Sequence, residues 1–173
     1  MSTLENGREI TFGEAIKEAL MEEMHRDSHV FIIGEDVAAA GTVFKVLTGL
    51  LDEFGPERVI DSPISEAGIT GIGVGAAVTG MRPVVDIMFG DFTTLAMDQM
   101  VNQAAKTHYM SGGRLRVPMV IRTTMGAGRR SAAQHSQSLH AWYSQVPGLK
   151  VAIPVSYTHL RAHETEAELV CRL

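Results

Sequence analysis

Three side chains in this sequence have the chemistry and the setting to take part in catalysis. Glu66 lies in the segment Asp61-Ser-Pro-Ile-Ser-Glu-Ala-Gly-Ile69, between a short strand-like run and a long apolar run rich in glycine and alanine. Glu35 follows the apolar run Val30-Phe-Ile-Ile33, and His135 lies among small and polar residues. Carboxyl and imidazole groups exchange protons near neutral pH when their surroundings shift their pKa. The residue types therefore predict proton-transfer chemistry.

Each of these residues also has an interpretation without a functional role. A carboxylate in the first turn of a helix is stabilised by the helix dipole, so Glu66 could serve only that purpose. Glu35 could be a solvated loop carboxylate, and His135 could be a solvated loop histidine. The residues by themselves leave both interpretations open.

The segments around these residues alternate between strand-like and helix-like patterns, which predicts an α/β fold with a mainly parallel sheet between two layers of helices. Helices are expected over residues 12–26, 46–54, 66–80, 92–109 and 138–143. Strands are expected over residues 30–33, 58–60, 84–87, 117–121 and 149–153. Thr11-Phe-Gly-Glu14 forms a capping box for the first helix, and Ser65 is expected to cap the helix of Glu66.

Ligands of open parallel sheets bind beyond the carboxyl ends of the strands. Glu35 and Glu66 each follow a predicted strand there. The loop Gly126–Ser138 carries His135 and follows the fourth predicted strand. Loops of this length inside a compact domain are more often functional than not. We therefore expect Glu35 and Glu66 at the ligand-binding edge of the sheet, and His135 in a loop from which it can reach a substrate.

Composition limits the classes of function. The chain has 173 residues, 45% of them hydrophobic and 20% charged, which suits one domain with a buried core. A formal net charge of −5 argues against nucleic acid or an anionic membrane as a partner. A single cysteine excludes an internal disulfide, and the N-terminus lacks a signal-peptide pattern. These features predict a cytoplasmic protein without a transmembrane span.

The glycine run Gly71-Ile-Gly73-Val-Gly75-Ala76 matches the Gly-x-Gly-x-x-Ala pattern of dinucleotide-binding turns. That pattern requires the glycines directly after a strand, whereas here they fall inside the predicted helix. We therefore expect a small-residue helix against which another helix or a ligand packs very closely. A nicotinamide-binding oxidoreductase remains an alternative.

Residues 156–173 depart from the pattern of the rest of the chain. The segments Tyr157–Thr165 and Leu169–Leu173 resemble a translated sequencing-adapter tail. We expect the domain to occupy residues 8–155 and the tail to be non-native, with a divergent native helix as the alternative. For this reason His159, His163 and Cys171 are not interpreted as a metal site.

Several short segments occur in an order that is specific when taken together. They are Gly34-Glu-Asp-Val37, Asp61-Ser-Pro-Ile-Ser-Glu-Ala-Gly68, Gly90-Asp-Phe92, Asp98-Gln99, Asn102–Lys106, Tyr109-Met-Ser-Gly-Gly113, Ala133-Gln-His-Ser-Gln137 and Pro147-Gly-Leu-Lys-Val151. From about Arg8 to Pro154 the chain resembles the beta subunit of the thiamine-diphosphate-dependent 2-oxoacid dehydrogenase family. The segments Arg122-Thr-Thr124 and Arg129–Ala133 look closest to acetoin dehydrogenase and related bacterial pyruvate dehydrogenases.

The resemblance implies a transketolase-like pyrimidine-binding domain with thiamine diphosphate as its cofactor. It implies that Glu66 bonds to the aminopyrimidine ring, that Phe92 stacks on this ring and that Ile64 lines the pocket. It places Glu35 near the cofactor. It also makes His135 the loop histidine that handles protons on the substrate side and faces the lipoyl group.

The resemblance further implies an assembly. In the family an alpha subunit holds the diphosphate and magnesium through a Gly-Asp-Gly motif, which this sequence lacks. This chain would therefore supply only the pyrimidine half of a site shared within a heterotetramer. The family's beta subunit also has a C-terminal domain, missing here, that docks a lipoyl acyltransferase core. The Met119 carbonyl matches one ligand of a structural potassium ion in some members.

The implied reaction is cleavage of acetoin, or decarboxylation of a 2-oxoacid such as pyruvate, with transfer of the acyl group to lipoamide. This truncated chain alone is expected to be inactive without an alpha subunit. The alternative, from another class, is a catalytically inactive fragment that only binds a partner subunit.

Overall fold

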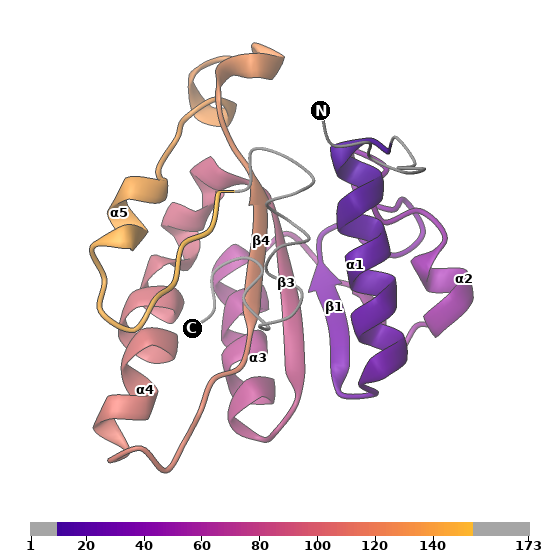
Figure 1. Ribbon diagram of the computed structural model, residues 1–173. Coiled ribbons are helices and arrows are strands. Elements are labelled where there is room, and N and C mark those ends of the chain that lie inside the picture. Colours follow the sequence, from indigo (N-terminus) through magenta and orange to yellow (C-terminus); the bar gives the residue numbers. More distant parts are fainter. Residues whose placement is uncertain (1–9, 154–173) are drawn as a thin grey trace, which may run out of the picture.

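The protein is built on a parallel four-stranded sheet in the order β2-β1-β3-β4. The computed structural model describes residues 10–153. The strands are β1 (Val30–Gly34), β2 (Val59–Asp61), β3 (Arg82–Phe89) and β4 (Val120–Thr124). All three strand pairs run in the same direction, so their carboxyl ends lie at one edge of the sheet, the upper edge in Figure 1.

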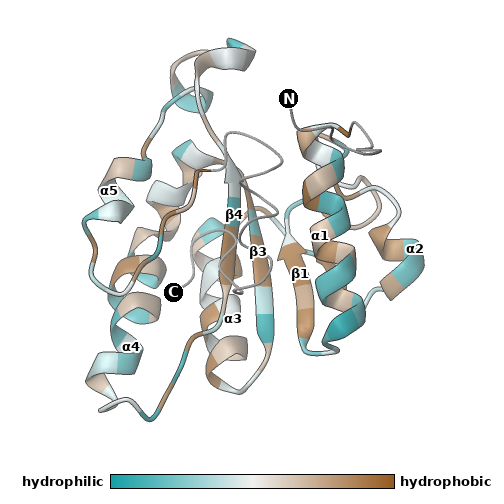
Figure 2. Cartoon of the chain, viewed as in Figure 1, coloured by the Kyte–Doolittle hydropathy of each residue, from teal (hydrophilic) through white to brown (hydrophobic). Residues whose placement is uncertain are grey.

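Helices cover both faces of the sheet. On one face α1 (Phe12–Arg26) and α2 (Leu50–Phe54) pack over a core that includes Val30 and Ile32 of β1. On the other face α3 (Glu66–Val78) and α4 (Ala105–Met110) lie over a core that includes Phe31 and Ile33. Alternate residues of a strand point to opposite faces, so a strand covered on both sides is apolar throughout, as Figure 2 shows for β1. The predicted three-layer α/β fold is confirmed.

Side-chain hydrogen bonds satisfy backbone groups at both ends of α1. The Thr11 hydroxyl accepts a hydrogen bond from the Glu14 amide (3.2 Å), and the Glu14 carboxylate accepts one from the Thr11 amide (2.7 Å). The predicted capping box is therefore present. At the other end, the Arg58 guanidinium donates to the carbonyl oxygens of Met24, Asp27 and Val30. These bonds satisfy carbonyl groups at the end of α1 and tie the helix to β1 and β2.

Some predicted boundaries were wrong. The helix predicted over residues 46–54 begins only at Leu50, and the fourth strand begins at Val120 rather than at residue 117, because Pro118 has no amide to donate. The Ser65 side chain makes no capping hydrogen bond to α3.

The single helix predicted over residues 92–109 is three segments of different winding. A 3-10 helix covers Gly90–Ala96 (η1), a π-helix covers Gln99–Ala104 (η2), and α4 completes the run. Thr93 and Thr94 in η1 each donate a side-chain hydrogen bond to a carbonyl three residues earlier, which favours the tighter winding.

The fifth strand predicted over residues 149–153 is absent, because this segment forms no ladder with β4 among the described residues. Leu149 and Val151 nevertheless pack against the core on the α3 side. The predicted strand is therefore wrong, because partial burial does not make a strand without a hydrogen-bonded neighbour.

A buried ion pair joins β3 to β4. Asp86 and Arg122 occupy paired positions in the two strands, are 5% and 7% exposed, and form a hydrogen-bonded salt bridge. Burial raises the pKa of Asp86, and the Arg122 guanidinium opposes that rise. The pair specifies the register of the two strands, since a shift of one residue would separate the charges.

Helix α3 approaches the sheet more closely than a side chain would allow at one position. A Cβ atom on Gly73 would lie 2.6 Å from the Val85 side chain and 3.1 Å from that of Met119. At Gly75, by contrast, a Cβ atom would meet nothing within 4 Å. The close approach expected from the glycines is thus present at Gly73, but the neighbour is the sheet rather than the expected helix or ligand.

Replacing these two glycines by alanine should change stability in opposite directions. We expect Gly73→Ala to lower the free energy of unfolding by about 1–3 kcal/mol, because the β-branched Val85 cannot move aside easily. Gly75→Ala should raise it by about 0.5–1 kcal/mol through helix propensity alone. Urea denaturation of both variants measures the difference. Equal effects of the two substitutions would contradict the packing described here.

Candidate functional site

The candidate catalytic residues lie beyond the carboxyl ends of four adjacent strands. Glu35 follows β1 directly, and Glu66 is the first residue of α3 after β2. Phe92 lies in η1 after β3, and His135 ends the 3-10 turn Ala133–His135 (η4) in the loop after β4. Residues up to a hundred positions apart in sequence therefore reach the same edge of the sheet. Glu35 and Glu66 were predicted there, and the structure adds Phe92 and His135.

Glu35 and Glu66 are close enough to influence each other. Both side chains are half-buried, and the pKa of Glu35 is raised by burial first and then by the charges of Asp36 and Glu66. The two loops that carry them are joined by hydrogen bonds. The Ala38 amide donates to the Asp61 carboxylate (2.7 Å). The Ser62 amide donates to the Gly34 carbonyl (2.9 Å).

The end of β1 requires a glycine just before Glu35. A Cβ atom on Gly34 would lie 2.7 Å from the Asp86 carbonyl oxygen and 2.8 Å from the Val37 side chain. The next residue but one, Asp36, has a left-handed backbone conformation with φ of 53°. The chain therefore turns sharply at the sheet edge, and the turn fixes the direction of Glu35.

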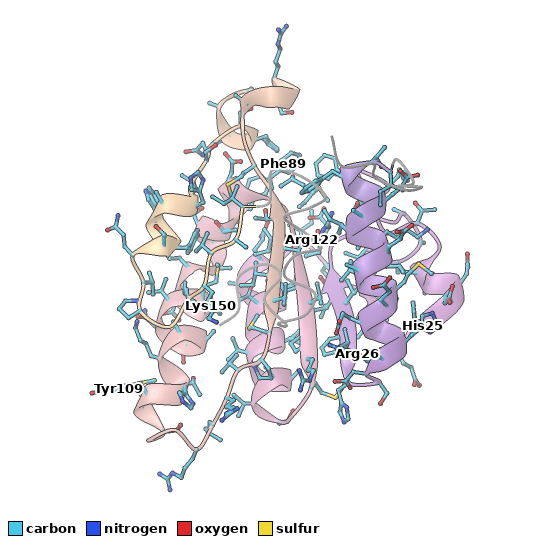
Figure 3. The ribbon with its side chains drawn as sticks, in the orientation of Figure 1. His25, Arg26, Phe89, Tyr109, Arg122 and Lys150 are labelled. Carbon is cyan, nitrogen blue, oxygen red and sulfur yellow. The ribbon has the colours of Figure 1, made fainter. Side chains whose placement is uncertain are left out.

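An aromatic cluster forms the other part of the site. His135 packs edge to face against Phe89 and Phe92, with ring centroids 4.7 and 5.1 Å apart. Phe89 also contacts Phe44, at 5.5 Å, and Phe92, at 6.0 Å. Figure 3 shows Phe89 at the upper edge of the sheet, with Arg122 lower on β4. We call these four residues, Phe44, Phe89, Phe92 and His135, the aromatic cluster.

The structure brings the two predicted site residues His135 and Phe92 into contact, which the sequence did not predict, and adds two residues that sequence reasoning missed. Phe89 is the last residue of β3, where the ligand-binding edge of the sheet begins. Its position at the end of a strand could therefore have identified it as a site residue. Phe44 lies in the loop between β1 and α2, and nothing in its sequence neighbourhood points to Phe89.

Two further predicted residues lie elsewhere. Ile64 is 73% exposed in the turn between β2 and α3, close in sequence to Glu66. Met119 is fully buried and directly precedes β4, at the amino-terminal edge of the sheet, away from the other candidates. A potassium ion at its carbonyl stays a prediction. Within residues 10–153, no three His, Cys, Asp or Glu side chains gather as a possible metal site.

The glycines of the dinucleotide-like pattern lie inside α3 rather than in a turn. Gly73 packs against β3. A dinucleotide site requires these glycines in a phosphate-binding turn directly after a strand, and no such turn is formed by the glycines of α3. Among the described helices, none is long and apolar enough to cross a bilayer.

The proximity of Glu35 and Glu66 makes a testable prediction. Because the pKa of Glu35 is raised above its ordinary 4.5, the folded chain binds more protons than the unfolded chain between that value and the raised one. Glu35 therefore lowers the free energy of unfolding as pH rises through that window. Glu66→Gln removes one cause of the shift and should lower the pKa of Glu35, measured by an NMR titration of its carboxyl carbon. Glu57→Gln, at the opposite edge, is the control, and equal titrations in both variants would contradict the arrangement.

Comparisons with known proteins agree with this fold. The model of the family "Transketolase, pyrimidine binding domain" matches residues 8–166. The pyruvate dehydrogenase E1 component subunit beta of Rickettsia bellii (strain RML369-C) is 55% identical over 148 residues, which are 86% of this chain and 46% of that protein. The protein of the same name from Rhizobium meliloti (strain 1021) is 52% identical over 84% of this chain and 32% of its own length.

A solved structure described as a split gene transketolase, an inactive beta4 tetramer, superposes with a TM-score of 0.69. The match covers 89% of this chain and 46% of that one, at 20% sequence identity, and shows a shared fold. This chain spans about half the length, or less, of the curated relatives it matches. Together with the parallel sheet, the family match shows that the chain belongs to the transketolase pyrimidine-binding domain family.

Proposed function

We propose that this chain supplies the pyrimidine-binding half of a thiamine diphosphate site in the beta subunit of a 2-oxoacid dehydrogenase. The observation that carries the proposal is that Glu66, Glu35 and the aromatic cluster all lie beyond the carboxyl ends of the strands, at one edge of the sheet. The names of the relatives favour pyruvate as the substrate to test first, with acetoin second.

The residues at this edge suit one part of the cofactor better than the other. Aromatic rings and carboxyl groups are complementary to a flat, neutral ring that carries nitrogen donors and acceptors. Glu35, Asp36 and Glu66 create a negative potential that would repel a diphosphate group. We infer that the diphosphate and its magnesium are held by a separate alpha subunit, so that the site is completed only between two chains.

Glu66 is the residue that we assign to activation of the cofactor. When bound, thiamine diphosphate supplies a thiazolium ring that stores the electron pair released as the substrate loses carbon dioxide or an acyl fragment. Glu66, half-buried at the start of α3, would hold a proton at a nitrogen of the pyrimidine ring. Glu35, with its raised pKa, would stay protonated over a wider pH range beside it.

His135 is assigned to the substrate side of the site. Its ring is half-buried and held between Phe89 and Phe92, so its position is fixed although it belongs to a loop. An imidazole in this position would move a proton at the reacting oxygen and face an incoming lipoyl group. The proposed partners are an alpha subunit, as a heterotetramer, and a lipoyl acyltransferase core.

Several finer expectations belong to the same proposal. The exposed Ile64 would line the pyrimidine pocket once a partner chain covers it. The Met119 carbonyl would be one ligand of a potassium ion, and the enzyme would work in the cytoplasm. The expected domain boundary at residue 155 and the expected non-native tail concern residues outside the described part of the chain.

A second candidate function is a partner-binding fragment without catalytic activity. The observation that favours it is that this sequence lacks the Gly-Asp-Gly motif through which a diphosphate and its magnesium would be held. Such a fragment would associate with an alpha subunit without supporting turnover.

Replacing Glu66 by glutamine tests the proposal in a complete beta subunit assembled with its alpha subunit. We expect kcat on pyruvate to fall by about 10²–10⁴-fold, because the amide cannot exchange the proton. The unfolding midpoint in urea should change little. Glu57→Gln, an exposed acid before β2, is the matched control. A kcat of Glu66→Gln close to that of the control would refute the assignment.

A further inference from the structure

One buried carboxylate near the site has no role in the scheme above. Asp91 in η1 is 4% exposed. Its Oδ1 atom accepts two hydrogen bonds from a single residue, one from the Gln137 backbone amide (3.1 Å) and one from the Gln137 side-chain nitrogen (2.8 Å). Gln137 lies two positions after His135, in the loop that follows β4. We call this pair of bonds the Asp91–Gln137 clasp.

The same glutamine also closes the base of that loop. Its carbonyl oxygen accepts a hydrogen bond from the Gly126 amide (3.2 Å), so residues 126 and 137 are joined across the loop that contains His135. Both the backbone and the side chain of Gln137 are therefore used to fix one end of the loop. Loops held at their base in this way present the residues of their tip in a limited set of positions.

The loop between these two residues needs such a restraint. Ala132 has φ of 64° and ψ of −169°, a backbone region that is favourable almost only for glycine. Arg130 is also left-handed, with φ of 53°. A backbone of this kind relaxes unless contacts elsewhere determine it. The clasp provides those contacts within two residues of His135.

The clasp connects the loop to the element that carries the aromatic partner of His135. Asp91 and Phe92 are neighbours in η1, so the bonds of Asp91 to Gln137 and the contact of Phe92 with His135 bind the same two segments. A second link lies alongside, where the Tyr143 hydroxyl donates to the Thr93 hydroxyl (2.6 Å). Three consecutive residues of η1 therefore contact the chain that follows β4, and these contacts fix the position of His135 relative to Phe92.

Burying the carboxylate of Asp91 destabilises the fold more than burying an apolar side chain of similar size would. The Oδ2 atom of Asp91 is buried and, within the described residues, has no hydrogen-bond partner. An unpaired buried oxygen destabilises a fold, whereas a charge-assisted bond to a nearby amide is strong and directional. Asp91 therefore orients Gln137 through its Oδ1 atom, while its buried Oδ2 atom lowers the free energy of unfolding.

From these contacts we propose that Asp91 is a positioning residue that holds His135 against Phe89 and Phe92 through Gln137. In this role Asp91 acts by fixing the loop through Gln137 rather than by taking part in the chemistry itself. The structural part of this proposal stands alone, while its effect on catalysis rests on the function proposed for His135.

The two glutamines that flank His135 give a matched pair of variants. Gln137→Leu removes the side-chain half of the clasp, and Gln134→Leu changes an exposed glutamine of the same loop outside the clasp. In the 173-residue chain we expect Gln137→Leu to speed trypsin cleavage after the exposed Arg130 about tenfold or more. The His135 ring protons should lose the NMR shifts caused by Phe89 and Phe92. Gln134→Leu should behave as wild type, and equal behaviour of the two variants would overturn the proposal.

A conservative substitution of Asp91 shows whether this residue positions the loop through its hydrogen bonds or only fills space. Asp91→Asn keeps an acceptor oxygen for both bonds of Gln137, whereas Asp91→Ala removes it. We expect slow cleavage and shifted His135 signals in Asp91→Asn, and fast cleavage with unshifted signals in Asp91→Ala. Wild-type behaviour of Asp91→Ala would contradict the proposal. If Asp91→Ala does not fold, the comparison of Gln137→Leu with Gln134→Leu decides the question.

Turnover then tests the catalytic consequence separately. In the complex with an alpha subunit, Gln137→Leu should lower kcat on pyruvate about tenfold and leave KM within about twofold, because the loop rather than substrate binding is disturbed. Loss of loop order with unchanged kcat would overturn the catalytic consequence and leave the clasp itself supported. The absence of activity in both wild type and variant would count against the proposed function alone.

Discussion

The common direction of the four strands is the constraint on which the site depends. Because β1, β2, β3 and β4 are all parallel, every segment that follows a strand begins at the same edge of the sheet. Gly34 allows β1 and β3 to approach closely at that edge, and the pair Asp86–Arg122 fixes the register of β3 against β4. Glu35 and Glu66 from the first two loops and Phe92 and His135 from the last two therefore lie beyond the same edge of the sheet.

Much of this arrangement could be predicted from local signals in the sequence. The capping box at Thr11 and the continuous apolar run of β1 each depend on a few neighbouring residues, and both predictions were confirmed. Contacts between distant segments carry no such signal. Phe44 and Phe89 meet from different loops, and the π-helix of η2 has no pattern that distinguishes it from an α-helix. Residues 149–153 have the alternation of a strand but pair with no described neighbour.

The electrostatics of the site explain why one chain would hold only half of a cofactor. The pKa of Glu35 is raised by burial and by the nearby charges of Asp36 and Glu66. Such a carboxyl group suits proton exchange with a neutral ring, and the acidic surroundings oppose binding of phosphate groups. If the phosphate groups are bound by another chain, the acidic residues of this chain can exchange protons with the ring without repelling those phosphate groups. The loop of His135 is held to η1 by Asp91, and His135 contacts Phe92 there.

The central claim is that the thiamine diphosphate site is shared between two chains, and calorimetric titration tests it most directly. Thiamine diphosphate with magnesium is titrated into this chain, into the alpha subunit of the same enzyme, and into their mixture. The account predicts tight binding only in the mixture, with the tightness lost when Glu66 is replaced by glutamine. Binding to this chain alone that is as tight as binding to the mixture would contradict it.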